Sequence, residues 1–182
     1  MTTKESISSC AARLFRKKGY PATSMRDIAD RVGIKAASIY NHYRSKQMVL
    51  EELLLDIAHR FATGMEVVKS SDQKAVDQLA QLIDLHVELA VNHTDASALI
   101  TGEWVHLEGK TRSTYLQLRD QYESDFRQIL EQAKSDGYFK DVDTEIAMFS
   151  ILSTLRWLYS WYNRNKQYDV EALKEQMKRA LL

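Results

Sequence analysis

The segment from residue 36 to residue 43 is predicted to form a short helix whose outer side carries small, hydroxyl, amide and aromatic side chains. These outward residues are Ala36, Ala37, Ser38, Tyr40 and Asn41. Hydroxyl and amide groups can hydrogen-bond to base edges and phosphate oxygens, and small side chains allow close approach to a groove. Such a helix is typical of proteins that read the major groove of DNA.

Two helices joined by a glycine turn, between Pro21 and Lys46, would hold this surface in place. Thr23 and Ser24 can cap the first helix by accepting hydrogen bonds from its free backbone N–H groups. Gly33 can adopt the left-handed conformation that commonly ends a helix. Apolar residues spaced by one, three and four positions give the first helix an apolar inner side, and one apolar residue in the turn and one in the second helix continue it. That side consists of Ile28, Ala29, Val32, Ile34 and Ile39.

Charge is distributed unevenly along the chain. Residues 1–50 contain ten Lys or Arg and three Asp or Glu, a net charge of +7, and the remaining residues carry −7. The formal net charge of zero therefore conceals a polarised molecule. A basic end attracts the DNA backbone, and an acidic remainder discourages other contacts with nucleic acid.

The run ARLFRKKGY, followed by ATSMRDIADRVGI and ASIYNHYRSK, resembles the amino-terminal DNA-binding domain of the TetR family of bacterial transcriptional regulators. The resemblance covers about residues 5–55. The matching positions are Leu14, Phe15, Gly19, Tyr20, Thr23, Ser24, Ile28, Ala29, Gly33, Tyr40, His42, Tyr43 and Lys46. Lys35 stands where the family often has Ser, and Ala37 where Gly is frequent. These two departures bear on which operator is read.

The resemblance implies a role for each matching position. Thr23, Ser24, Tyr40, His42 and Lys46 are expected to contact phosphates. Lys35, Ala36, Ala37, Ser38 and Asn41 are the candidates for reading bases. Tyr43 matches an aromatic position that packs under the recognition helix, so we expect it in the core.

Composition favours an all-α fold without a membrane span. One proline and six glycines in 182 residues leave few turns, and strand-type alternation is nearly absent. No apolar run of eighteen residues exists, and the amino terminus shows no signal peptide. Cys10 is the only cysteine, which fits a reducing cytoplasm. We therefore expect a cytoplasmic protein with no membrane association.

About nine helices are predicted, in two domains. Residues 1–46 would form a three-helix helix-turn-helix domain, and residues 47–182 a helical ligand-binding and dimerisation domain. After the first three, the expected helices run from about Ser45 to Lys69 and from a cap at Asp72 to Ala90, then over 98–107 up to a stop at Gly109. The last three are expected at about 111–135, 143–163 and 169–181.

The helix around residues 146–162 is apolar on nearly all sides, and Arg156 is its only charge. One side can be buried within the domain, and the other requires a partner, for which a second copy related by a twofold axis is the simplest choice. The family likewise dimerises through its last two helices. We therefore predict a homodimer, with Leu158 in the interface and with apolar residues of the last helix contributing. The alternative is a central core helix in a monomer.

The carboxy-terminal half resembles, by its aromatic spacing, the ligand-binding domain of TetR regulators that respond to acyl-coenzyme A thioesters. This resemblance implies a long pocket with positive charge near its mouth. The candidate ligand-binding residues are Arg112, Tyr115, Arg119, Arg156, Trp157 and Trp161. Arg156 has a second interpretation, a salt bridge or a position at the dimer rim, and the two tryptophans could simply pack.

A helical metal-carboxylate oxidoreductase is the alternative function. Glu103 and His106 form an E-x-x-H pair, but a di-iron site needs two such pairs and two further glutamates. His86 and Glu88 would leave the set incomplete, and His106 is better explained as a core or pocket-lining residue. We therefore predict a non-enzymatic protein without metal or cofactor. It would be a dimeric repressor that binds a palindromic double-stranded operator and is released by a small-molecule effector, with an acyl-coenzyme A thioester as the candidate.

Overall fold

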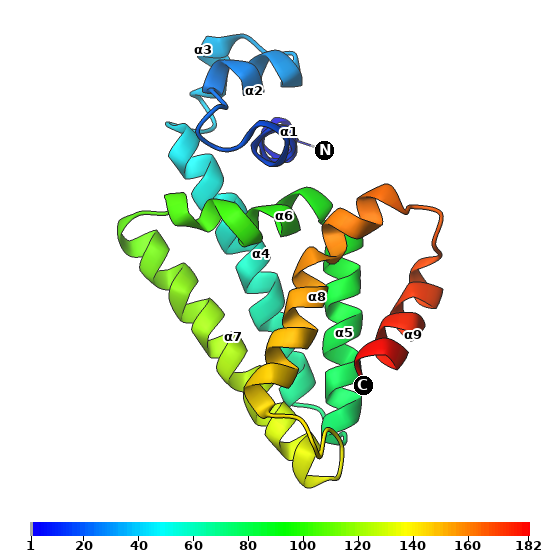
Figure 1. The fold of residues 1–182 in the computed structure, drawn as a ribbon. Helices are drawn as coiled ribbons and strands as arrows, with labels where there is room; N and C mark the ends of the chain where they lie inside the picture. The colour runs from blue at the N-terminus through cyan, green and yellow to red at the C-terminus, as the bar shows by residue number, and fades with distance from the viewer. Residues whose placement is uncertain (1) are drawn as a thin grey trace. The chain divides into compact units, whose positions relative to one another are not determined.

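The computed structural model describes residues 2–182 and shows an all-α chain, as predicted (Figure 1). Within these residues the structure has nine α-helices and one 3-10 helix, and no strand. Their bounds are α1 Thr3–Lys18, α2 Met25–Val32, α3 Ala36–Ile39, α4 Lys46–Lys69, α5 Ala75–Asn92, α6 Thr94–Gly102, η1 Glu103–His106, α7 Gly109–Ser135, α8 Thr144–Arg164 and α9 Val170–Leu181.

Side-chain caps fix the starts of several helices where the sequence predicted them. Ser45 Oγ accepts a hydrogen bond from the N–H of Met48 at the start of α4. Asp143 accepts from two N–H groups at the start of α8, and Asp169 accepts from the N–H of Ala172 at the start of α9. Each cap satisfies backbone donors that have no partner within the helix, which stabilises the helix by about 1 kcal/mol.

Three predicted boundaries were wrong. Helix α5 begins at Ala75 with Lys74 as its cap residue, and not from a cap at Asp72. The gap expected between the helix ending at Ala90 and the helix beginning at residue 98 shrinks to His93, because α6 already begins at Thr94, whose hydroxyl donates to the carbonyl of Ala90 (2.8 Å). Gly109 does not stop a helix but is the first residue of α7, at a φ of +50°.

The chain forms two compact units. Unit 1 comprises the residues up to Ala58 together with Asp95–Tyr115, and unit 2 comprises His59–Thr94 and Leu116–Leu182. Helices α4 and α7 contribute residues to both units. The domain boundary predicted between residues 46 and 47 stays a prediction. The structure adds that α6, η1 and the start of α7 pack in the same unit as the first three helices.

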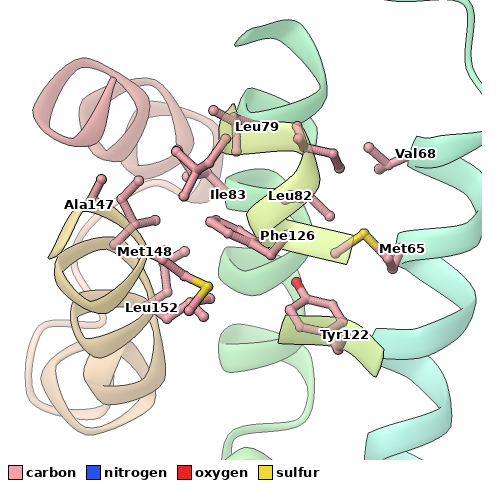
Figure 2. Packing of buried hydrophobic residues seen from close by; sticks show 14 of the residues in the cluster. Met65, Val68, Leu79, Leu82, Ile83, Tyr122, Phe126, Ala147, Met148 and Leu152 are labelled. Atoms are coloured by element: carbon pink, nitrogen blue, oxygen red, sulfur yellow. The ribbon is translucent and has the colours of Figure 1, made fainter. Parts of the chain in front are cut away.

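Unit 2 has an apolar core to which α4, α5, α7, α8 and α9 contribute, and Figure 2 shows the side chain of Phe126 among residues of the first four of these helices. Met65 and Val68 enter from α4, residues 79, 82 and 83 from α5, Tyr122 and Phe126 from α7, and residues 147, 148 and 152 from α8. Phe126 is fully buried, and burying such a side chain stabilises the fold by about 1.5–3 kcal/mol. This core leaves only one side of α8 for other contacts.

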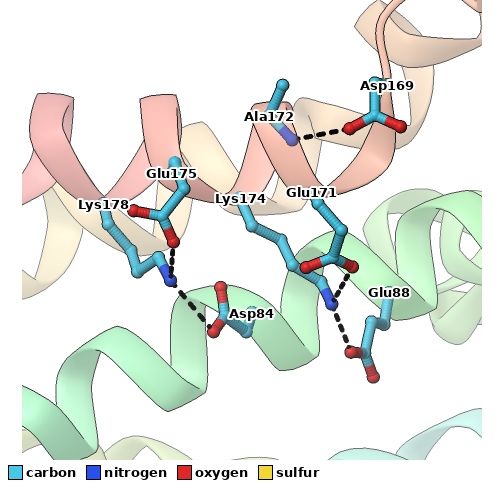
Figure 3. A network of polar contacts seen from close by, with 8 residues as sticks. All are labelled: Asp84, Glu88, Asp169, Glu171, Ala172, Lys174, Glu175 and Lys178. Carbon is cyan, nitrogen blue, oxygen red and sulfur yellow. Dashed lines mark hydrogen bonds and ion pairs between the residues drawn. The ribbon is translucent and has the colours of Figure 1, made fainter.

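Helix α9 is held against α5 by ion pairs as well as by apolar contacts (Figure 3). Lys174 Nζ lies 2.7 Å from Glu88 and 2.9 Å from Glu171, and hydrogen bonds to these two carboxylates raise the pKa of Lys174. Lys178 Nζ lies 3.3 Å from Asp84 and 2.6 Å from Glu175. Both lysines are mostly covered, so these pairs are less screened by salt than pairs on an open surface.

Between residues 2 and 182 the structure shows no helix with the length and apolar content needed to cross a membrane.

Candidate nucleic-acid interface and effector residues

Helix α2 begins with a capping box that fixes the entry of the chain into the helix-turn-helix. Ser24 Oγ accepts from the N–H of Asp27 (3.1 Å), and Asp27 Oδ2 accepts in return from the N–H of Ser24 (2.8 Å). The hydroxyl of Ser24, its backbone N–H and then the Lys18 ammonium stabilise the carboxylate, which lowers the pKa of Asp27 to about 2. The predicted cap is therefore confirmed at Ser24.

Gly33 ends α2 in the left-handed conformation, with φ +82° and ψ 30°, as predicted. The N–H groups of Gly33 and Ile34 both donate to the carbonyl of Ala29, at 3.0 and 3.1 Å. An L-residue with a side chain would be strained at this φ, so glycine suits the turn. The turn delivers the chain directly into α3.

The candidate recognition helix is shorter than predicted. Helix α3 ends at Ile39, and residues 40–42 continue as turns, in which the N–H groups of Asn41 and His42 donate to the carbonyls of Ser38 and Ile39. Ile39 is buried and anchors the helix, whereas Tyr40 is 53% exposed. Along this helix and turn the structure groups six exposed candidates with the half-buried Ser38. The exposed six are Lys35, Ala36, Ala37, Tyr40, Asn41 and His42.

Thr23 and Lys46 differ from this group because their polar atoms bind the turn that precedes α2. Thr23 is buried, and its hydroxyl donates to the carbonyl of Gly19 (2.9 Å). Lys46 Nζ donates to the carbonyl of Tyr20 (2.7 Å) and lies 4.2 Å from the centre of the Tyr20 ring. Their phosphate contacts stay a prediction, and the structure gives each of them a positioning role.

Tyr43 is buried, in agreement with its predicted place in the core, and it directly follows residues 35–42, which we call the recognition segment. Its hydroxyl donates to Glu52 Oε1 (2.5 Å) and accepts from Ser8 Oγ (2.6 Å). Burial and the bond to Glu52 raise the pKa of Tyr43 to about 12, so the phenol stays neutral. Tyr43 thus joins the end of the recognition segment to α1 and α4.

The contacts between η1 and the turn that follows α1 were not predicted from the sequence. The N–H of Tyr20 donates to Glu103 Oε1 (3.3 Å), and the Tyr20 hydroxyl donates to Gln47 Oε1 (2.6 Å). The Gln47 amide donates to the carbonyl of His106 (3.0 Å), whose ring lies against Tyr20 with centroids 5.1 Å apart. Glu103 was considered as a metal ligand and His106 as a core or pocket-lining residue, and in the structure both brace the DNA-binding helices within unit 1.

The candidate effector residues do not form one group. Arg112 and Tyr115 belong to unit 1, where Arg112 is exposed and Tyr115 is buried with its ring stacked on Trp104. The other four candidates belong to unit 2. Arg156 pairs with Glu123, which confirms the salt-bridge interpretation, and Arg119 pairs with Asp120 (2.9 Å).

Trp157 and Trp161 lie on the solvent side of α8 rather than in the core of unit 2. Trp157 is 61% exposed and Trp161 is 38% exposed. The Trp161 ring contacts Tyr168, with centroids 5.1 Å apart. In a single copy of the chain these two side chains therefore form surface and not the lining of an interior.

Unit 2 contains a buried polar pair that was not predicted from the sequence. His86 Nε2 lies 2.9 Å from the hydroxyl of Tyr122, and the ring of Phe61 packs on the imidazole with centroids 4.7 Å apart. Burial lowers the pKa of His86 to about 3, with a smaller contribution from Arg156, and burial raises the pKa of Tyr122. Both groups are therefore neutral near pH 7. A histidine within the apolar repeat of α5 was the only available sequence signal.

The residues considered for a metal-carboxylate site are dispersed. Glu103 and His106 face one another at 3.5 Å in unit 1, His86 is bonded to Tyr122, and Glu88 is paired with Lys174. In the part of the chain that the structure describes, no three His, Cys, Asp or Glu side chains are grouped as metal ligands.

Comparisons with known proteins agree with this architecture. The family model described as bacterial regulatory proteins of the tetR family matches residues 7–53, and the model described as tetracyclin repressor-like, C-terminal domain, matches residues 72–182. The HTH-type transcriptional repressor KstR2 of Rhodococcus jostii strain RHA1 is 33% identical over 171 residues, which cover 91% of this chain and 82% of the relative.

Two solved structures show the same fold. The ketosteroid transcriptional regulator KstR2 of Mycobacterium tuberculosis has a TM-score of 0.91 at 23% identity, covering 99% of this chain and 93% of that chain. AibR in complex with isovaleryl coenzyme A and operator DNA has a TM-score of 0.82 at 24% identity, covering 99% and 98%. The capped helix-turn-helix, the helical second unit and both family matches lead to one conclusion: this chain belongs to the TetR family and is a DNA-binding transcriptional repressor of that non-enzymatic family.

Proposed function

We propose that the protein acts as a homodimer that represses transcription at a palindromic operator and leaves the DNA when a small-molecule effector binds, with an acyl-coenzyme A thioester as the candidate effector. The observation that carries this proposal is the apolar outer side of α8. A contact between two copies through this side of α8 would hold two short recognition segments at a fixed separation, so that both bind one operator.

Four large apolar side chains follow one side of α8 at helical spacing and face solvent in the single chain. They are Ile146 (59% exposed), Phe149 (69%), Trp157 (61%) and Trp161 (38%). The positions between them on this side are small, with Ser150, Ser153 and Thr154 allowing close approach of a second helix. A monomer gains nothing from such a surface, whereas a second copy related by a twofold axis would cover it.

The structure changes two details of the predicted interface. Leu158 is buried in the core of unit 2, so a charge at this position would unfold the domain rather than separate copies. The apolar side of α9, which includes Leu173 and Met177, also packs onto that core. Most of the proposed interface therefore comes from α8, while α9 contributes its outer, mainly polar side.

A twofold dimer would present to DNA two copies of the surface formed by residues 35–38 and 40–42, which we call the α3 surface. Dimers of this type bind half-sites one helical turn, roughly 34–36 Å, or a multiple of it apart, and the operator is then a palindrome. Phosphate contacts from Ser24, Tyr40 and His42 would set the register, and Lys35, Ser38 and Asn41 would contact bases.

The thioester class is supported by similarity and by charge. AibR, which shares the fold, has been solved with isovaleryl coenzyme A, and this chain carries Arg119 and Arg156 on the effector-binding unit. Guanidinium groups suit the phosphates of coenzyme A. Arg112, Tyr115, Trp157 and Trp161 complete the set of residues that we propose for mutation.

Footprinting on the DNA that flanks the protein's own gene, followed by titration with acyl-coenzyme A thioesters, tests the proposal. We expect a protected palindrome, and release by one or more thioesters but not by coenzyme A alone or by the free acids. If a palindrome is protected but no thioester releases the protein from it, the proposed effector class is disproved and the proposed dimeric repressor is not. Protection of an asymmetric site would disprove binding by a twofold-symmetric dimer.

A further inference from the structure

Most of the unpaired positive charge of the first fifty residues lies away from α3 and the turn that follows it. Four of the ten basic residues in positions 1–50 are in ion pairs: Lys4, Arg16, Lys18 and Arg26. Lys46 is bonded to backbone carbonyls. Among the described residues the other five have no ion pair, and they are Arg13, Lys17, Arg31, Lys35 and Arg44. Only the last two of these flank α3.

The three remaining unpaired cations share one groove between α1 and α2. This groove has a volume of about 440 Å³ and is lined by Arg13, Leu14, Lys17, Lys18, Asp27, Asp30 and Arg31. The residues from α1 follow spacings of one, four and five, and those from α2 follow spacings of three and four, so each helix contributes a single side. No residue of α3 lines the groove.

The two acidic residues of the groove are already engaged. Asp27 is bonded to Ser24 and lies 3.3 Å from the ammonium of Lys18, and Asp30 lies 4.0 Å from Arg26. The cations of Arg13, Lys17 and Arg31 therefore remain available to an external anion. Leu14 is the only apolar residue of the lining, which disfavours an amphipathic acidic peptide as the occupant.

We propose that the α1–α2 groove is a second contact surface for the DNA phosphate backbone, separate from the α3 surface that reads the operator. A polyanion with regularly spaced phosphates matches several exposed, flexible cations along two helix sides, and arginine suits phosphate oxygens. The phosphates come from DNA flanking the operator or from a second duplex. The inference rests on the DNA-binding role of the family and requires neither the effector nor the dimer.

Salt-dependent binding of a groove variant tests this inference. The variant combines Arg13→Gln, Lys17→Gln and Arg31→Gln, three exposed positions whose replacement leaves the core intact. The control combines Lys74→Gln, Lys110→Gln and Lys140→Gln, which remove the same charge at exposed positions outside the groove. Thermal melting confirms that both variants are folded.

Fluorescence anisotropy gives the slope of log K against log salt for two operator duplexes. One ends at the footprint edges, and the other extends by roughly fifteen base pairs, about one and a half turns, on each side. We expect the groove variant to lower the slope on the long duplex by about one unit for each cation that touches a phosphate, and to leave the slope on the short duplex at the control value. That result identifies flanking DNA as the source of the phosphates.

A capture assay identifies the other source. Protein bound to an immobilised short operator is offered a labelled random duplex, and loss of capture in the groove variant alone identifies a second duplex. The inference is overturned if slopes and capture match the control variant, or if the slope falls equally on both duplexes, because the cations would then act within the operator itself. These comparisons can still be made if the thioester does not release the protein or if the protein is not a dimer. Failure of the proposed function can therefore be told apart from failure of this inference.

Discussion

Side chains of the DNA-binding unit divide into those that face outward and those that hold the outward surface in position. Tyr40, Asn41 and His42 are exposed on the turn after α3. Thr23 and Lys46 bind carbonyls of the turn before α2. A mutation of the first kind should change affinity alone, whereas one of the second kind should change affinity and stability together.

Tyr40→Phe should weaken operator binding by about tenfold or more while the melting temperature stays unchanged. The substitution removes only a hydroxyl from an exposed side chain, and a hydrogen bond to a charged phosphate is worth about 1.5–3 kcal/mol. Gel-shift titration measures the affinity. The matched control is Tyr138→Phe, the same change at an exposed tyrosine of the α7–α8 loop. Equal affinities for the two variants would remove the Tyr40 hydroxyl from the contact set.

His86 should make the folded state sensitive to acid. The pKa of His86 is about 3 in the folded chain and near its ordinary value of 6.5 when unfolded, so below pH 6.5 the unfolded state binds a proton that the folded state excludes. The stabilisation is complete above pH 6.5 and decreases as the pH falls toward 3, by about 1.4 kcal/mol per pH unit.

Urea unfolding of the wild type and His86→Gln from pH 7.5 to 4.5 measures this effect. His86→Gln should be less stable at pH 7.5, because the buried pair with Tyr122 is disturbed, yet lose less stability on acidification. His59→Gln, an exposed position in the same unit, should keep the wild-type pH dependence. If the free energy of unfolding changed with pH equally in all three proteins, protonation of His86 would not be the cause of the acid sensitivity.

At the scale of elements, the sequence predicted what local chemistry determines. Ser24 was predicted to cap α2, and helix starts were predicted at about residues 143 and 169. In the structure all three side chains accept hydrogen bonds from the next N–H groups. Lys74 begins α5 without any side-chain cap, so no local signal existed there. Thr94 appeared to belong to a polar loop, because nothing in its type shows that its hydroxyl would bond to a carbonyl of α5.

The candidate site shows the same limit. The α3 surface was predictable because its residues are neighbours in sequence. The contact of Tyr20 with Glu103 joins residues 83 positions apart and depends on packing that no local pattern encodes. The two sides of α8 could be recognised as apolar, but Leu158 was placed on the wrong one, since near-uniform hydrophobicity leaves the inner side undefined until α5 and α7 are placed.

Helix α8 provides the prediction that belongs to this scale. Phe149→Glu should convert the proposed dimer to monomers by weakening association at least about thirtyfold, because a central aromatic residue typically contributes 2 kcal/mol or more to an interface. Sedimentation velocity measures the change. Phe149 is 69% exposed in the single chain, so the fold should persist. Val67→Glu places the same charge at an exposed apolar position on α4 and should remain dimeric. Unchanged dimers for Phe149→Glu would remove this surface from the interface.

At the scale of the whole molecule, charge and apolar surface are separated along the chain. The net charge of +7 lies in the first fifty residues, which contain the helix-turn-helix, and the exposed apolar side of α8 lies in unit 2. DNA binding and the proposed contact with a second copy therefore use different residues and different forces, so salt should weaken the first much more than the second.

Effector and operator should oppose each other by the same factor in both directions. If a thioester weakens operator binding by a given ratio, thermodynamic linkage requires saturating operator to weaken thioester binding by that ratio, typically about 5–150-fold. Calorimetric titration of thioester into free and operator-saturated protein measures one side, and anisotropy with and without thioester measures the other. In Phe149→Glu, where single chains cannot hold two recognition segments at a fixed separation, thioester affinity should no longer depend on operator. A thioester whose apparent affinity keeps falling in proportion to operator concentration, without reaching a plateau at saturating operator, would contradict the two-state release mechanism and would indicate direct competition for the α3 surface.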